Sequence, residues 1–454
     1  MARTKHSDFQ NETRYMDACE HRSRVQSRGY SLEGGNTYDD PSYDFDTTAP
    51  HKATDSERAL EAISYNTSQL HIRKPRSALD SADSSDMKAV SASKRGLEEG
   101  VSHVSSATIQ NARLVHGTGH FQSTHPNEDE HFVVSEKKFK AFGVLDGHGH
   151  SAQNVAKFAS DKFRTFLETK SWLTVVRSSK DITEALSEFF RSVEADFFAS
   201  IKGIVTEIES LIASIPSTMK SHDALLRYPD EVLQIQRLEP RISGGCTAVV
   251  AVVCGNKLYV ANVGDSRAVL VYQTPNGALE TLQLSTDHSV DNKEELKRLE
   301  KLGLDPEELK RAGRLGPQEN TRSIGDYNIK RGYKSVDVLR FATSPPGIAE
   351  PSVRVVDLED SGTKGRAHYL ILMSDGVYKS IEAQFNKVEF IDSNKVVAAM
   401  VEHCENDCAD FGKVALVTLN RLVRVHCDTF SRGSARAQAC SRRDDMTLLV
   451  YKFV

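Results

Sequence analysis

The chain has 454 residues, of which 39% are apolar and 27% charged, with a net charge of −5 and a pI near 6.4. This length can bury a large core, and the charge leaves no basic footprint for nucleic acid or an anionic membrane. No stretch approaches the ~18 apolar residues of a membrane span, and the amino terminus lacks the apolar region of a signal peptide. We therefore expect a soluble protein with neither partner, located in the cytoplasm, with nuclear presence also compatible.

The first 107 residues are poor in aliphatic side chains and rich in Ser, Asp, Arg and His. Such a segment buries too little apolar surface to offset its own ordering entropy. Residues 1–107 are therefore predicted to be a disordered N-terminal region, followed by one catalytic-type domain over 108–454. The seven cysteines form no CxxC pair and no regular framework, which favours reduced thiols.

Strand and helix patterns alternate from residue 131 onward. Residues 131–134 and 140–145 predict a hairpin, and 152–169 predicts a helix with one apolar face. A second helix begins near residue 182. Residues 201–240 continue with an apolar repeat and then a polar stretch containing Pro, which indicates an insertion.

The second half of the chain begins with three short apolar runs, in SGGCTAVVAVVCGNKLYVANVGDSRAVLVY, separated by Gly-Asn and Gly-Asp turns. These runs predict antiparallel strands. Asn292 and Glu295 can cap a short helix, 391–428 predicts two amphipathic helices, and 446–453 predicts the last strand. Because strands come in runs with helices between and after them, the pattern favours an α+β or layered sandwich fold.

Four aspartates stand where strand-like apolar runs end or begin: Asp146, Asp265, Asp375 and Asp444. A lone Asp after a strand is usually a turn residue. Four of them gather carboxylates at one edge of the sheet core, where they repel one another unless a hard divalent cation neutralises them. The set predicts a site for Mg²⁺ or Mn²⁺.

Seven motifs in order resemble the PPM-type metal-dependent Ser/Thr protein phosphatases, from about residue 115 to the end. They are Glu128-Asp129, Asp146-Gly147-His148-Gly149, Ser243-Gly244-Gly245-Cys246-Thr247-Ala248, Gly264-Asp265-Ser266-Arg267-Ala268, Thr321-Arg322-Ser323-Ile324-Gly325-Asp326, Ser374-Asp375-Gly376 and Asp444-Asp445-Met446-Thr447. The resemblance implies an αββα sandwich of two antiparallel sheets flanked by helices. It also implies a hydrolase that acts on phosphoserine and phosphothreonine in phosphoprotein substrates, in signal transduction.

For single residues, the resemblance implies a centre of two magnesium or manganese ions. Asp146 matches the ligand that bridges them. Glu128 and the carbonyl of Gly147 match the ligands of one ion, and Asp375 and Asp444 those of the other. Two such cations activate a shared water and stabilise the entering and leaving oxygens of an in-line displacement.

Three further roles follow from the same resemblance. Asp129 matches a carboxylate that orders a water beside the metals. Asp265, together with Asp375, matches the site of a third ion. His148 is then the general acid that protonates the departing seryl or threonyl oxygen.

Two positions depart from the family pattern. Thr124 stands where the family usually has an Arg that grips the substrate phosphate, and Thr does not replace its planar fork. Lys379 stands where active members usually carry Asp. We therefore expect weakened phosphate binding and slow or narrow catalysis, and the sequence leaves the substrate-binding residues unknown.

Several stretches resemble the TAB-type adaptor, the binding protein of the TGF-beta-activated kinase, among them QRLEPRISGG, EELKRLEKLGLD, LILMSDGVYKSIEA and VHCDTFSRGSARA. That branch has the same fold and is generally a pseudophosphatase. Two hypotheses follow: a Mg²⁺- or Mn²⁺-dependent protein serine/threonine phosphatase, favoured because the metal-binding acids are present, and a TAB-like pseudophosphatase adaptor that regulates a MAP kinase kinase kinase signalling complex. A third reading is a domain that uses metal for stability alone.

Overall fold

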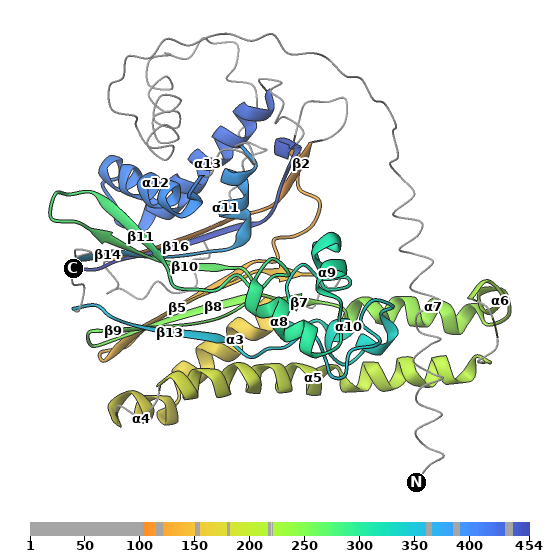
Figure 1. Ribbon diagram of the computed structural model, residues 1–454. Coiled ribbons are helices and arrows are strands. Elements are labelled where there is room, and N and C mark those ends of the chain that lie inside the picture. Colours follow the sequence, from red (N-terminus) through yellow and green to blue (C-terminus); the bar gives the residue numbers. More distant parts are fainter. Residues whose placement is uncertain are drawn as a thin grey trace.

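Two five-stranded antiparallel sheets lie face to face in the middle of the molecule, and helices cover the outer face of each (Figure 1). The computed structural model describes residues 103–114, 121–149, 155–178, 182–216, 219, 221–359, 366–384, 391–431 and 439–454. This four-layer arrangement confirms the predicted α+β sandwich of two antiparallel sheets flanked by helices. None of the described helices combines the length and the apolar character needed to span a bilayer.

The two large sheets are built from strands far apart in the sequence. The first has the order β1 (Val104–Ile109), β16 (Met446–Lys452), β14 (Arg366–Met373), β10 (Arg267–Gln273) and β11 (Leu279–Gln283). The second has the order β13 (Ser352–Asp357), β9 (Lys257–Val263), β8 (Ala248–Cys254), β5 (Phe139–Leu145) and β4 (Glu130–Ser135). Two small sheets join β12 (Ile324–Gly325), β7 (Gly245–Cys246) and β6 (Gly147–His148), and β15 (Arg442–Arg443), β2 (Ala112–Leu114) and β3 (Phe121–Gln122).

The central strands of the large sheets are buried on both faces, which explains their nearly continuous apolar sequences. In β5, Phe142 and Val144 face the other sheet, whereas Ala141 and Leu145 pack on the helical side. Phe142 stacks on Tyr451 of the facing sheet with 4.9 Å between ring centroids. Burying one such Phe or Val side chain contributes about 1.5–3 kcal/mol.

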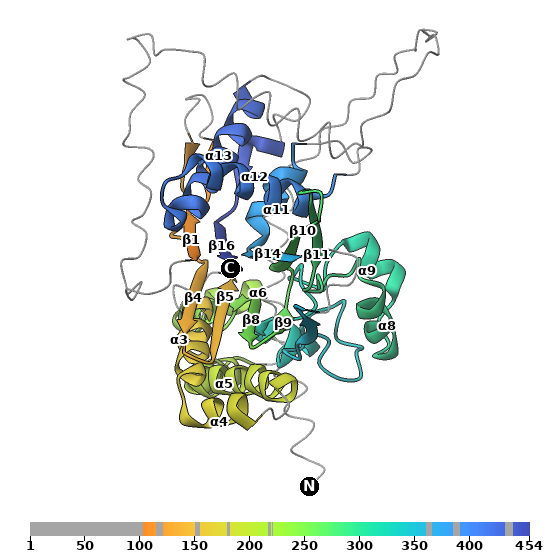
Figure 2. The ribbon, with the colours of Figure 1, turned by 90° about the vertical axis from the view of Figure 1, so that its left-hand side faces the viewer.

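Helices divide between the two outer faces. The second sheet is covered from the side of α3 (Val155–Leu167), α4 (Lys170–Ser178) and α5 (Ile182–Ser214), and the first from the side of α11 (Asp375–Glu382), α12 (Ser393–Asp407) and α13 (Val414–Ser431). Beside the sandwich lie α8 (Lys293–Lys301) and α9 (Pro306–Ala312), followed in the chain by the short α10 (Tyr327–Lys330) (Figure 2).

Most predicted elements are confirmed. The hairpin is β4 and β5, the helix over 152–169 is α3, the three apolar runs are β8, β9 and β10, and the helices over 391–428 are α12 and α13. The side chain of Asn292 accepts hydrogen bonds from the backbone of Glu294 and Glu295, as its predicted capping role requires. The stretch 201–240 forms the end of α5, then α6 (Ser221–Arg227) and α7 (Pro229–Leu238), which extend beyond the sheets (Figure 1).

The predicted start of the folded domain at residue 108 is wrong, because β1 begins at Val104. Ser105 and Ser106, which belong to the segment predicted to be disordered, lie in this strand. Ser105 is 2% exposed; its hydroxyl donates to the carbonyl of Gly412 and accepts from the backbone N–H of Ala415. Pairing with β16 satisfies the strand backbone, a long-range contact that composition does not reveal. Residues 1–102, and the disorder predicted for them, lie outside the described residues.

Candidate active site

Antiparallel pairing brings the predicted acidic residues to one edge of the sandwich. In the second sheet, β5 and β9 run in the same direction because β8 lies antiparallel between them, and in the first sheet β14 ends where β16 begins. Asp146, Asp265 and Asp375 follow β5, β9 and β14, and Asp444 precedes β16. Together with Glu128 they line one cavity of about 320 Å³.

The neighbours of Asp146 in the sequence also line this cavity. Gly147 and His148 form β6, which pairs with β7, so the turn after Asp146 is held as part of a small sheet. The backbone of Asp146 is fixed by Thr247, whose hydroxyl accepts from the Asp146 N–H at 3.2 Å and whose N–H donates to the Asp146 carbonyl at 2.9 Å. The structure thus places the predicted bridging ligand on a rigid segment.

The carboxylates of the cavity repel one another strongly. Burial raises the pKa of Asp146 well above its usual range, and the charges of Asp129 and Asp375 raise it further. Burial and the charge of Asp265 raise the pKa of Asp375 to about 6, against the opposing effect of Lys379. Groups in this situation favour their ionised form only when a cation lies nearby. Crowded carboxylate oxygens are also the donor type that Mg²⁺ and Mn²⁺ prefer, so the residues fit such ions.

Asp129 lies behind the cavity and is 7% exposed. Its Oδ2 accepts a hydrogen bond from the hydroxyl of Ser374 at 2.7 Å, whereas Oδ1 is buried without a partner in the described part of the chain. A buried acceptor of this kind is normally paired, often with an ordered water. This is compatible with the predicted water-ordering role of Asp129.

Asp445, next to Asp444, has a structural role that the sequence did not single out. It is 4% exposed and accepts from the backbone N–H of Asn111 at 2.6 Å and from that of Glu128 at 2.9 Å. The two neighbouring aspartates therefore have different roles. Asp444 lines the cavity, whereas Asp445 fixes the backbone of Glu128.

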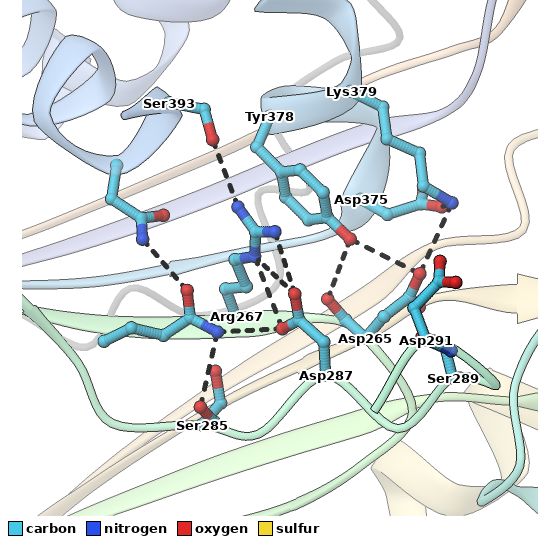
Figure 3. Close-up of polar contacts among 12 residues, drawn as sticks. Asp265, Arg267, Ser285, Asp287, Ser289, Asp291, Asp375, Tyr378, Lys379 and Ser393 are labelled. Atoms are coloured by element: carbon cyan, nitrogen blue, oxygen red, sulfur yellow. Dashed lines mark hydrogen bonds and ion pairs between the residues drawn. The ribbon is translucent and has the colours of Figure 1, made fainter. Parts of the chain in front are cut away.

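The acidic oxygens do not converge on one point. Within the described ranges, no three His, Cys, Asp or Glu side chains are arranged to hold an ion as they lie. Two of the predicted ligands, Asp265 and Asp375, are instead engaged by Lys379 (Figure 3). A two-metal centre at this cavity therefore requires side-chain rotations of the carboxylates.

His148 forms an ion pair with Asp326, the last residue of the Thr321–Asp326 motif. Its Nε2 lies 3.0 Å and 2.9 Å from the two carboxylate oxygens of Asp326. Burial alone would lower the pKa of His148, but the charge of Asp326 raises it overall. Gln318 donates to the same carboxylate at 2.8 Å and Ser323 donates to its other oxygen, so Asp326 is held firmly.

Asp326 does occupy a turn, with a left-handed φ of 56°, and is 1% exposed. A non-glycine residue in this region is strained, and such strain concentrates at functional sites. A Cβ at Gly245 would overlap the Asp326 carboxyl group, so glycine is needed there for close approach. In the sequence, Asp326 stands out as the last residue of the Thr321–Asp326 motif, but nothing links it to His148, which lies 178 positions away.

A model of the family described as protein phosphatase 2C matches residues 102–413. Among curated relatives, "Probable protein phosphatase 2C 7" of Oryza sativa subsp. japonica is 25% identical over 354 residues, covering 76% of this chain and 68% of the rice protein. "Probable protein phosphatase 2C 40" of Arabidopsis thaliana is 36% identical over 154 residues, covering 32% of this chain and 30% of its own length.

A Caenorhabditis elegans protein named "TGF-beta-activated kinase 1 and MAP3K7-binding protein 1" is 27% identical over 220 residues, covering 48% of this chain and 50% of the worm protein. The match thus spans half or less of the worm and Arabidopsis proteins. Among solved structures, serine-threonine phosphatase 2C from Toxoplasma gondii superposes with a TM-score of 0.42 and 16% identity, covering 78% of this chain and 95% of that one. Since the family model covers well over half of its length, this chain belongs to the protein phosphatase 2C family.

Proposed function

We propose that this chain is a Mg²⁺- or Mn²⁺-dependent protein serine/threonine phosphatase, which hydrolyses phosphoserine and phosphothreonine with an activated water. The observation that supports it most is the meeting of His148 and five predicted acidic site residues, Glu128, Asp146, Asp265, Asp375 and Asp444, at one cavity. The residues that would hold two ions are Glu128, Asp146, Gly147, Asp375 and Asp444. When bound, such ions supply a water of lowered pKa and stabilise charge on the transferred phosphoryl group.

The general acid of the reaction is His148. As water oxygen bonds to phosphorus, the bond from phosphorus to the seryl or threonyl oxygen breaks, and that oxygen takes up a proton. An imidazolium carries a proton on each ring nitrogen. Because Nε2–H donates to Asp326, the proton on Nδ1 is the one free to transfer. Asp326 keeps the ring charged and oriented, so it is a positioning residue.

A second cavity offers positive charge for a phosphoprotein substrate. It has a volume of about 560 Å³, shares Asp444 and His125 with the acidic cavity, and is also lined by Arg113, Arg442 and Arg443. Of the three, Arg443 donates to the backbone carbonyl of Gln110 at 2.9 Å. Guanidinium groups of this kind suit phosphate or acidic side chains of a substrate.

The departure at Thr124 fits this picture, because Thr124 also lines the second cavity. Its backbone N–H and hydroxyl both donate to the side-chain oxygen of Asn111, at 3.0 Å and 3.1 Å. Thr124 is thus engaged with the protein. In this proposal, Arg113, Arg442 and Arg443 of the same cavity contact the substrate phosphate in place of the arginine that the family usually has at this position.

The test is phosphate release from a phosphothreonine peptide by the full chain, with Mg²⁺ or Mn²⁺ titrated. We expect metal-dependent release that EDTA abolishes and that Asp146→Ala removes by several orders of magnitude. The matched control is Asp161→Ala, an exposed aspartate of α3, which should retain full activity. Equal release by wild type and Asp146→Ala, or none with metal bound, would refute the proposal.

One observation favours a second candidate, a TAB-like adaptor of a TGF-beta-activated-type kinase complex: the likeness to the C. elegans kinase-binding protein. The adaptor should co-purify with a kinase of that class, and the association should survive Asp146→Ala. Failure of the wild-type chain to retain the kinase would count against it. Among the described cysteines, Cys246, Cys254, Cys404 and Cys408 are free thiols, which suits either role in the cytoplasm.

A further inference from the structure

We infer that the ammonium group of Lys379 takes the place of a third cation between Asp265 and Asp375, so that this chain binds two divalent ions and not three. The inference deepens the proposed function, because it concerns the metal content of the same site. It also replaces the third-ion role that the family resemblance implies for Asp265. The inference is argued from the contacts of Lys379, Asp265 and Tyr378.

Lys379 is placed by helix geometry. It lies four residues after Asp375 in α11, so the two side chains share one face of the helix, one turn apart. The ammonium group pairs with Asp375, lies 3.3 Å from Oδ2 of Asp265, and reaches Glu319 at 3.5 Å (Figure 3). One cation thus joins two of the predicted metal ligands directly.

Asp265 is fully engaged by protein groups. Its Oδ1 accepts from the side-chain amide of Asn320 at 3.1 Å, and its Oδ2 faces both Lys379 and the hydroxyl of Tyr378, each at 3.3 Å. The residue is 8% exposed, so little water is available to compensate for displacing these groups. A metal ion at Asp265 would have to compete with the amide, hydroxyl and ammonium groups that already contact its carboxylate.

The surroundings hold Tyr378 and therefore Asp265 in place. The guanidinium carbon of Arg267 lies over the ring of Tyr378, 3.5 Å from its centroid, and the group donates to Asp287 at 2.8 Å and to Ser393 at 3.1 Å (Figure 3). This stack joins the start of β10 to α11 and α12. Moving Asp265 toward a metal would break its hydrogen bond with Tyr378 and disturb the packing of Tyr378 against Arg267.

Charge also favours the ammonium over a third ion. The ammonium group of Lys379 brings a positive charge into direct contact with the carboxylates of Asp375 and Asp265. A divalent ion between the same carboxylates would lie within a few Å of this positive charge. At such separations like charges repel strongly, even at the dielectric of a protein surface. Lys379 must leave before a third ion can enter.

The experiment counts bound ions. The metal-free full chain is titrated with Mn²⁺, and bound ions are counted by calorimetry and by the loss of the free-ion paramagnetic resonance signal. We expect two ions for wild type and for Asp265→Asn. Lys379→Asp should gain one further, weaker ion, and that gain should vanish in the Lys379→Asp, Asp265→Asn double variant. Lys395→Asp, which alters a surface lysine paired with Glu280, is the matched control and should bind two.

A third ion in wild type that disappears in Asp265→Asn would overturn the inference. So would a Lys379→Asp variant, shown to be folded by circular dichroism, that still binds two ions. If Lys379→Asp fails to fold, the comparison of wild type with Asp265→Asn still decides. The count is independent of phosphate release: two ions without hydrolysis would refute the phosphatase proposal and leave this inference intact.

Discussion

Replacing Glu295 by Gln should lower the free energy of unfolding by about 3 kcal/mol at neutral pH, the scale expected when a buried charge loses its partner. The side chain of Glu295 is 2% exposed. Its Oε1 accepts from Arg322 at 3.0 Å, and its Oε2 accepts from Arg298 at 2.9 Å and from Thr321 at 2.7 Å. Gln keeps the size but removes the charge, which leaves two half-buried arginines without their carboxylate.

The magnitude follows from the pKa. Burial alone would raise the pKa of Glu295, but the two arginines lower it from 4.5 to about 2. This difference of roughly 2.5, at about 1.36 kcal/mol per pKa unit, corresponds to about 3 kcal/mol. Because the folded-state pKa is depressed, the stabilisation is fully present above pH 4.5 and is lost as the pH falls toward 2.

The assay is urea unfolding of wild type, Glu295→Gln and Glu294→Gln over a series of pH values. Glu294 is the neighbouring exposed residue of the same helix, paired with Lys297, and its replacement should leave stability unchanged. The deficit of Glu295→Gln should shrink as the pH falls below 4.5. A deficit under about 1 kcal/mol at pH 7 would show that solvent screens the cluster as it screens a surface pair.

Three further variants test other parts of the structure. Asp326→Asn should slow phosphate release at least about 100-fold, because His148 loses its charged partner, as measured by steady-state kinetics. Burial, reinforced by a nearby arginine, lowers the pKa of His288 to about 4, so wild type should lose stability as the pH falls from 6.5 toward 4, and His288→Gln should flatten this decline in thermal unfolding. Gly376→Ala should lower the free energy of urea unfolding by about 1–3 kcal/mol, because its Cβ overlaps the carbonyl oxygen of Asp445.

Much of the fold could be predicted because its elements carry local signals. The hairpin of β4 and β5 shows as two apolar runs around a polar turn, and α8 shows as an Asn cap followed by an apolar repeat. The grouping of Asp146, Asp375 and Asp444 could also be predicted. In antiparallel sheets the end of one strand lies beside the start of its neighbour, so residues at these points meet at one edge. The hairpin and α8 depend on neighbours in the sequence, and the shared edge of the aspartates follows from the alternating direction of the strands.

Other features could not be predicted, because partners far apart in the chain decide them. Ser105 lies in the segment predicted to be disordered, and only its pairing with β16 makes it part of a strand. Asp326 ends a family motif, but only the approach of β6, β7 and β12 brings it to His148. A side chain's pKa and partners depend on what surrounds it in space, which local pattern does not encode.

The sequence by itself determined the α+β architecture, the family motifs and the identity of the acidic residues at the strand ends. Only the tertiary structure decided how those acids are neutralised. Lys379 could be read as a mere departure from the family, yet the packing of α11 against the end of β9 sets its ammonium group between Asp375 and Asp265. Coulomb attraction depends on separations of a few Å, and packing, not composition, fixes such separations.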